Sequence, residues 1–128
     1  MVAFTTTLTA LAAVFAVGFA APAQTNDLSS TNPLNIGEIS WSKVGYGACD
    51  VTSKDTDFVV AVSTFYFNAA DQCGREILVR HGVNSAVAKL VNCCSACKLN
   101  DIVLSPAAFE KAVGNLTMER VIGAWEFI

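Results

Sequence analysis

The chain has 128 residues, and its 8 Lys and Arg against 11 Asp and Glu give a formal net charge of −3 and a pI near 4.9. A chain of this length forms one ordinary domain at most. Proteins that bind nucleic acids usually carry clustered Lys and Arg on one face, which this composition does not provide, so we expect no nucleic-acid partner.

The N-terminal segment is strongly apolar. Leu8 to Ala20 form an almost unbroken run of Leu, Ala, Val, Phe and Gly, which is shorter than the roughly 20 residues of a membrane-spanning helix. Small residues follow it at the spacing that signal peptidase accepts. These features predict a signal peptide over residues 1–20, with cleavage as late as Ala23; a buried N-terminal helix is the alternative. We therefore expect a secreted, extracellular protein whose mature form contacts no membrane.

The rest of the chain has two predicted parts. Residues 21–35 are rich in Ser, Thr and Asn and contain Pro33, so they can bury little surface and are expected to form a flexible leader. Residues 36–128 are expected to form the folded domain. The apolar runs of this domain are short and bounded by turn residues, which indicates a mainly-β fold rather than a helical bundle.

Six segments carry strand signals. Asp57–Phe67 is β-branched and aromatic with nearly continuous apolarity, so we predict a central strand that is buried on both faces. Glu76–Arg80 and Ser85–Val91 flank a turn that contains Gly and Asn, which predicts a hairpin. The other three predicted strands are Gly37–Tyr46, Asp101–Leu104 and Glu119–Ile128, the last of which offers Val121, Ile122, Trp125 and Phe127 to the core.

One short helix is expected among the strands. Ser105 is a good N-cap, Pro106 fits the first helical position and Gly114 can close the C-terminus, so the pattern predicts a helix over about residues 106–113. Directly after it, Asn115-Leu116-Thr117 is an N-glycosylation sequon in a predicted exposed loop. An occupied and an unused sequon are both open at this point.

The domain contains five cysteines, namely Cys49, Cys73, Cys93, Cys94 and Cys97. In a small secreted domain, cysteines form disulfides that reinforce a modest core. A zinc site or a redox pair is disfavoured because there is no second Cys-x-x-Cys and the chain has a single histidine, His81. We expect no metal and no cofactor. Because five is odd, one thiol must be free, capped or intermolecular.

Several short motifs follow one another in a recognisable order. They are Gly37-Glu-Ile-Ser-Trp41, Gly45-Tyr46-Gly47-Ala48-Cys49, Val60-Ala-Val-Ser63, Cys73-Gly-Arg75, Cys94-Ser-Ala-Cys97, Ser105-Pro-Ala-Ala-Phe109 and a terminal Trp125. In this order they resemble the RlpA-like double-psi β-barrel family, with its small secreted fungal proteins related to expansin domain 1, the loosenins and barwin. The resemblance covers residues 37–128. It implies a disulfide-stabilised, six-stranded double-psi β-barrel with one or two short helices, and a shallow groove that binds polysaccharide in expansin-like members.

The sequence departs from the family at two acidic positions. The family's aspartates stand two residues before the Cys-x-x-Cys and just before the helix, where this chain has Asn92 and Val103. Glycosidic hydrolysis needs a proton donor and commonly a second carboxylate, so these two departures from the family favour a protein that is not an enzyme and leave catalysis open. Asp101 shares a strand face with Val103 and is a weak catalytic candidate; a solvated turn residue is the alternative.

The resemblance also implies which residues bind carbohydrate. It places Trp41 in the groove as an aromatic platform, with core packing as the alternative, and Tyr46 offers a second ring. Flat rings stack on the apolar faces of sugars, and nearby polar groups bond to the hydroxyls. The predicted carbohydrate-binding residues are therefore Trp41, Tyr46, Asn92 and Asp101.

The family's four usual cysteines match Cys49, Cys73, Cys94 and Cys97. The resemblance favours a pairing of Cys49 with Cys73 and of Cys94 with Cys97. It leaves Cys93 as the free or intermolecular thiol.

Three functions compete on these grounds. The first is a secreted, non-catalytic module that binds or loosens cell-wall polysaccharide. The second is a protein-directed module, either a protease inhibitor or a secreted effector acting on a host protein, because a barrel freed from catalysis can keep its fold while its loops are reused. A residual lytic enzyme ranks last. We expect a monomer whose partner is a cell-wall polysaccharide or a secreted or host protein.

Overall fold

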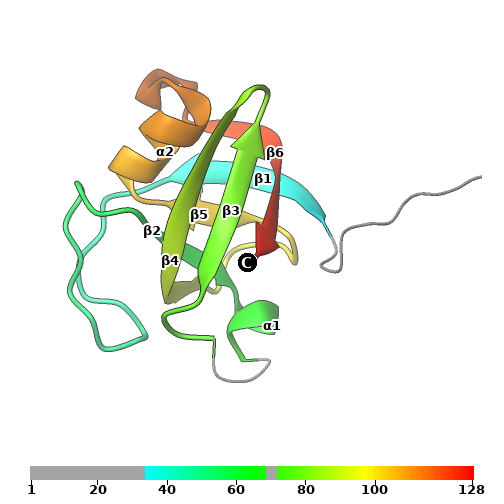
Figure 1. Cartoon of the computed structure of the whole chain (residues 1–128). Helices are drawn as coiled ribbons and strands as arrows, with labels where there is room; N and C mark the ends of the chain where they lie inside the picture. Colours follow the sequence, from blue (N-terminus) through cyan, green and yellow to red (C-terminus); the bar gives the residue numbers. More distant parts are fainter. Residues whose placement is uncertain (1–33, 69–71) are drawn as a thin grey trace, which may run out of the picture. The chain divides into compact units, whose positions relative to one another are not determined.

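The computed structural model describes residues 34–68 and 72–128, drawn in colour in Figure 1. The predicted signal peptide, both of its possible cleavage positions and most of the predicted leader lie outside the described residues. Within the described ranges, no helix combines the length and the apolarity needed to cross a membrane.

Six strands close into a barrel, so the domain is mainly β as predicted (Figure 1). The strands are β1 Asn35–Trp41, β2 Val59–Ser63, β3 Glu76–His81, β4 Asn84–Cys94, β5 Ile102–Leu104 and β6 Arg120–Phe127. Around the barrel they follow the order β1-β5-β2-β4-β3-β6. The pairs β1 with β5 and β2 with β4 are parallel, and the remaining pairs are antiparallel.

Alternate residues of the strands fill the barrel interior. Because successive side chains of a strand point to opposite faces, one face of each strand supplies the core. Its largest fully buried members are Trp125, Phe109, Ile39, Ile77, Leu90, Ile102 and Leu104. The indole N–H of Trp125 donates to the carbonyl oxygen of Asn100 at 2.9 Å, so burying this ring leaves no polar group without a partner.

The predicted helix is confirmed as α2, Pro106–Val113. The Ser105 hydroxyl accepts the N–H of Ala108 at 3.3 Å, as an N-cap does. Gly114 ends the helix at φ 108°, a left-handed conformation that glycine adopts without the steric cost of a Cβ. Phe109 packs from the helix into the core, so α2 covers part of the barrel interior.

The predicted hairpin is present as β3 and β4. The two strands pair with His81 opposite Asn84, which leaves a two-residue turn. Gly82 lies at φ 61° in this turn, where a short hairpin connection needs a positive φ. β4 continues to Cys94 rather than ending at Val91, and this extension carries the chain toward the cleft described below.

The prediction of one long strand over Asp57–Phe67 is wrong in its second half. Its last four residues, Thr64–Phe67, form the short helix α1. The helical turn places the Tyr66 ring against Trp125, with ring centroids 5.2 Å apart, and the Tyr66 hydroxyl within 3.0 Å of the side-chain oxygen of Asn100. These tertiary contacts outweigh the strand propensity of the local sequence.

The first predicted strand also ends earlier than expected. Gly37–Tyr46 is the predicted range, whereas β1 ends at Trp41 and Tyr46 forms only an isolated bridge with Thr52. After β1 the chain makes a last sheet-like bond, from the Ser42 N–H to the Leu104 carbonyl oxygen. It then leaves the barrel as a long loop that returns at β2.

The expectation that Ile122 belongs to the core is wrong. Its side chain is 65% exposed, because alternation along β6 turns it outward while Trp125 faces the interior. Val121 and Phe127 pack against the core, as predicted.

Candidate binding cleft

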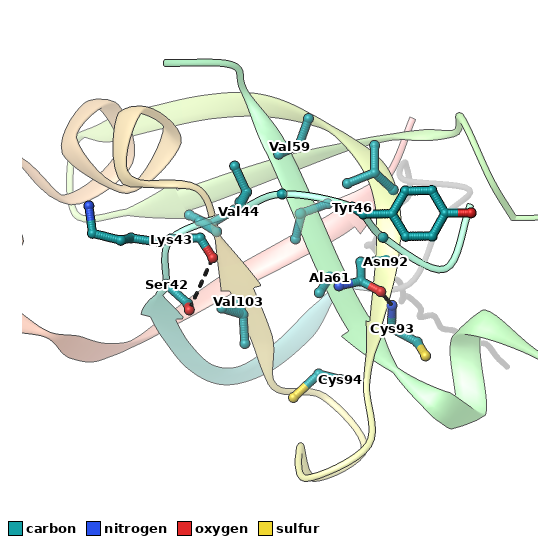
Figure 2. A pocket seen from close by; sticks show the side chains of 15 residues that line it. Ser42, Lys43, Val44, Tyr46, Val59, Ala61, Asn92, Cys93, Cys94 and Val103 are labelled. Carbon is teal, nitrogen blue, oxygen red and sulfur yellow. Dashed lines mark hydrogen bonds between the residues drawn. The ribbon is translucent and has the colours of Figure 1, made fainter. Parts of the chain in front are cut away.

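A cleft, called the main cleft below, lies between the loop after β1 and the strands β2, β4 and β5 (Figure 2). Its volume is about 320 Å³, at the lower end of the roughly 300 to 1,000 Å³ of small-molecule sites. The walls are mostly aliphatic, and the lining contains no Asp or Glu. The lining residues are Ser42, Lys43, Val44, Gly45, Tyr46, Gly47, Val59, Val60, Ala61, Val91, Asn92, Cys93, Cys94, Val103 and Leu104.

Tyr46 is the exposed aromatic ring of the main cleft. Its side chain is 72% exposed, so the ring is available to a ligand. The hydroxyl donates to the Asp50 carboxylate. This hydrogen bond, assisted by a smaller effect of burial, raises the pKa of Tyr46 above its ordinary value.

The loop that carries Tyr46 is anchored near its start. The Val44 N–H donates to Asp55 Oδ1 at 2.9 Å. This bond is the main reason that the pKa of Asp55 is lowered; burial opposes it, and the Lys43 ammonium at 3.4 Å adds to it. An anchored loop positions the Tyr46 ring before a ligand arrives, which reduces the entropy lost on binding.

Asn92 lies in the wall of the main cleft at the position of a family aspartate. Its side-chain oxygen accepts the backbone N–H of Ala48 at 2.9 Å and that of Cys93 at 2.9 Å. The amide therefore joins β4 to the loop, and its orientation follows from these two bonds. The structure brings Asn92 and Tyr46 together in one cleft.

Asp101 belongs to a different cavity. This second cavity, of about 210 Å³, is lined by Glu38, Ser40, Cys94, Ala96, Cys97, Asp101, Val103 and Arg120. Asp101 is half-buried and closes the turn that begins at Lys98: its N–H donates to the Lys98 carbonyl oxygen at 3.1 Å, Oδ1 accepts the Glu38 N–H at 3.0 Å, and Oδ2 accepts the Lys98 N–H at 3.3 Å. Both carboxylate oxygens thus accept hydrogen bonds from backbone N–H groups. Asp101 is therefore poorly placed to act on a ligand in the main cleft.

Trp41 lies outside the lining of both cavities. Its ring is half-buried and packs against the core cluster, and its indole N–H donates to the Leu116 carbonyl oxygen at 2.8 Å. This is the core-packing alternative that the sequence left open. No residue pattern separates the two alternatives, because the contact with Leu116 spans 75 positions of the sequence.

The disulfides join Cys49 to Cys73 and Cys94 to Cys97, the pairing that the family resemblance implies. Cys93 is the free, half-buried thiol and lines the main cleft. In the described part of the chain, no three His, Cys, Asp or Glu side chains gather in a way that could hold a metal ion.

Sequence reasoning missed the aliphatic walls of the main cleft and its loop anchor. Val44, Val59 and Ala61 carry no functional motif, and only the arrangement of the strands brings them together. Asp55 had one available signal: it stands among several acidic residues in a loop, where carboxylates often accept backbone N–H groups.

Solved structures of known proteins share this architecture. A papain inhibitor of Streptomyces has a TM-score of 0.67 and 25% sequence identity, and the match covers 75% of this chain and 94% of the inhibitor. An expansin variant of Clavibacter michiganensis in complex with cellohexaose has a TM-score of 0.67 and 19% identity, over 75% of this chain and 50% of the expansin. The same expansin without ligand gives a TM-score of 0.66. This chain therefore corresponds to about half of the expansin and to nearly all of the inhibitor.

The fold is a double-psi β-barrel. Its six strands fit the RlpA-like family that the sequence motifs resemble. No protein-family model and no curated protein matches the sequence. The solved structures that it matches include both an expansin in complex with cellohexaose and a papain inhibitor, so the fold alone does not choose between a carbohydrate and a protein as the partner.

Proposed function

We propose that this double-psi barrel is a secreted, non-catalytic module that binds a cell-wall polysaccharide in the main cleft. The observation that carries the proposal is the composition of that cleft: aliphatic walls, one exposed ring at Tyr46, and no carboxylate. A ring of this kind stacks on the apolar face of a sugar, and the neighbouring polar groups can bond to its oxygens. An expansin with the same fold holds cellohexaose, which supports the same class of ligand here.

The cleft offers no group for hydrolysis. Cleavage of a glycosidic bond needs a carboxylic acid close to the leaving oxygen, and the two family positions are Asn92 and Val103. Asp101 is directed to the backbone N–H groups of Glu38 and Lys98. Binding without turnover is the activity that these residues support.

Sedimentation with insoluble cellulose, chitin, β-glucan and peptidoglycan tests the proposal. We expect the protein to be retained on at least one polymer and to release no soluble sugar. Tyr46→Ala should weaken retention about tenfold, because the stacking surface is lost. Phe65→Ala is the matched control, since Phe65 is a 63% exposed ring on α1 outside both cavities.

Three results contradict the proposal. Absence of retention on every polymer shows that the protein does not bind these polysaccharides, and release of soluble sugar that depends on Asp101 supports a lytic enzyme instead. Retention that is equally weakened by Phe65→Ala indicates non-specific adsorption rather than binding in the cleft.

Inhibition of a protease is the second candidate function. The observation that favours it is the match to the Streptomyces papain inhibitor over 94% of that chain. A papain assay with increasing amounts of the protein tests it directly. Stoichiometric inhibition that survives Tyr46→Ala would place the protease contact outside the main cleft and favour this candidate over the first.

A further inference from the structure

The outer face of four neighbouring strands is apolar at its centre. Strands β1, β6, β3 and β4 are consecutive neighbours in the barrel (Figure 1), and alternate residues of each strand point away from the core. Ile36 is 56% exposed and lies opposite Ala124, while Ile122 is 65% exposed. We call this surface the sheet face, and its apolar residues are Ile36, Leu78, Val87, Ile122 and Ala124.

Each charged residue of the sheet face has a neighbour of opposite charge on the same face. The three pairs are Arg80 with Glu126 at 3.5 Å, Arg120 with Glu38 at 2.9 Å, and Glu76 directly opposite Lys89 across the β3–β4 pair. The sheet face is therefore neutral. It follows that the chain's net charge of −3 lies entirely outside it.

This distribution of charge favours a second copy of the same face as the partner. Nucleic acids and anionic membranes attract surfaces with an excess of positive charge, which the sheet face does not carry. In a symmetric dimer a patch meets itself, so a net charge on the patch would repel its own copy. A neutral patch with both signs avoids that repulsion, because the cations of one copy can approach the anions of the other. The excess negative charge elsewhere on the chain opposes association through other faces.

We propose that the sheet face is the contact surface of a weak homodimer, in which Ile36 and Ile122 of one copy pack against the same face of the other. Four strands about 4.8 Å apart and about six residues long cover roughly 400 Å², which is about half of the area that each partner buries in a standard interface. We therefore expect a dissociation constant of about 100 μM. The monomer expected from the sequence is then the state at low concentration.

The proposed contact is independent of polysaccharide binding. The residues of the sheet face lie outside the lining of the main cleft. A failure of dimerisation therefore leaves the proposed binding function in place, and a failure of polymer retention leaves the proposed dimer in place.

Sedimentation velocity of the wild-type protein between about 5 and 500 μM tests the proposal. We expect the weight-average mass to rise from the monomer mass toward twice that value. In methyl NMR spectra over the same range, the signals of Ile36 and Ile122 should shift with concentration. The methyl signals of Leu99 should stay in place, because Leu99 is 50% exposed in the turn before β5 and lies off the sheet face.

Ile122→Lys tests the apolar centre of the contact. It places like charges at the middle of both copies and should weaken dimerisation at least about tenfold. Leu99→Lys is the matched control, since it adds the same charge at a similarly exposed position off the sheet face. It should dimerise as the wild type does.

Two further variants test whether the charges of the face complement each other. Glu76→Lys makes the sheet face positive, and Lys89→Glu makes it negative. Each variant alone should dimerise about threefold more weakly in low salt, whereas an equimolar mixture should regain the wild-type affinity. Total charge predicts a different result, because Glu76→Lys brings the chain closer to neutrality and would strengthen association through any surface.

Four outcomes overturn the proposal. They are a constant mass up to about 500 μM, equal losses in Ile122→Lys and Leu99→Lys, stronger association of Glu76→Lys alone, and a constant mass with Ile36 and Ile122 methyl groups shielded from a soluble paramagnetic probe. The last outcome would show that another part of the same chain covers the face. If Ile122→Lys does not fold, the wild-type mass and methyl shifts still decide the question.

Discussion

The main cleft and the second cavity meet at Cys94 and Val103, which line both, yet their chemistry is opposite. The main cleft contains no carboxylate. The second cavity contains Glu38, Asp101 and Arg120, but these charges already have partners: Arg120 pairs with Glu38 at 2.9 Å, and Asp101 accepts two backbone N–H groups. On this side of the barrel the carboxylates therefore stabilise the structure, while the uncharged cleft remains available to a ligand.

The largest expected loss of stability comes from changing Gly47, where the loop after β1 packs against β4. Gly47→Ala places a Cβ 2.6 Å from the Val91 carbonyl oxygen, so either the loop or β4 must move. Overpacking of this kind lowers the free energy of unfolding by about 1–3 kcal/mol. Urea unfolding followed by tryptophan fluorescence measures the loss.

Gly45→Ala is the control for this change. Gly45 lines the same cleft, but a Cβ there meets nothing within 4 Å, and its stability should stay within about 0.5 kcal/mol of wild type. Equal losses in the two variants would show that the loop at Gly47 is not packed tightly against Val91 and Asn92 of β4.

A second prediction distinguishes the role of Trp41 from that of Tyr46, the other aromatic ring that the sequence analysis assigned to carbohydrate binding. Trp41→Phe removes the donor to the Leu116 carbonyl oxygen and part of the core contact, and should cost about 1–2 kcal/mol of unfolding free energy. It should leave polymer retention unchanged, because Trp41 lines neither cavity. Thermal unfolding and sedimentation on the same preparations measure both quantities. Loss of retention without loss of stability would return Trp41 to the binding site.

Local signals were sufficient where the structure depends on neighbours in sequence. The helix over Pro106–Val113 follows from its N-cap and its closing glycine, and the β3–β4 hairpin follows from its turn residues. The end of β2 could not be read in this way. Thr64–Phe67 has strand-forming residues, yet it turns into α1 because Tyr66 contacts Trp125 from a distant part of the chain.

The candidate site likewise contains residues that the local sequence indicates and residues whose place depends on long-range contacts. Asn92 and Tyr46 stand in or beside the family motifs of the sequence, and both line the main cleft; their role in binding carbohydrate stays a prediction. Trp41 stands at a groove position of the family by sequence, but its hydrogen bond to Leu116 holds it against the core. No local pattern could show that, because the contact depends on how the segment after α2 folds back on β1.

A third prediction concerns the Asn115 sequon, which lies outside both cavities. Asn115 is exposed, and its Oδ1 accepts the N–H and the hydroxyl of Thr117 at 2.9 and 2.8 Å. A glycan on Nδ2 replaces one amide hydrogen and spares both bonds. Expressed through a eukaryotic secretory pathway, the protein should therefore migrate more slowly on a gel until N-glycans are removed enzymatically.

Asn115→Gln and Thr117→Ala should each abolish that shift, and Thr117→Ser should keep it. Because Asn115 lines neither cavity, the glycosylated and deglycosylated proteins should bind polymer equally. Unchanged mobility of the wild-type secreted protein would show that the sequon is unused.

The smallest expected effect is a change in thermal stability, and it concerns Asp55, which anchors the loop after β1. The pKa of Asp55 is lowered in the folded protein, chiefly by the Val44 N–H. A carboxyl whose folded pKa lies below its unfolded value, which is near 3.9, stabilises the protein fully above that value and loses this contribution as the pH falls through the folded pKa. The thermal midpoint of the wild type should therefore exceed that of Asp55→Asn above about pH 4, and the gap should close at lower pH.

Glu110→Gln, on the exposed side of α2, controls for the general loss of negative charge. A gap that stays constant with pH would mean that the Asp55 carboxylate adds nothing beyond what an amide supplies to Val44. Salt then separates the two contributions to the difference in thermal midpoint, the ion pair with Lys43 and the hydrogen bond from the Val44 N–H. The pair of Asp55 with Lys43 is exposed and should be screened, whereas the bond to the backbone N–H should persist, so a gap that survives high salt assigns the anchoring of the Tyr46 loop to that single hydrogen bond.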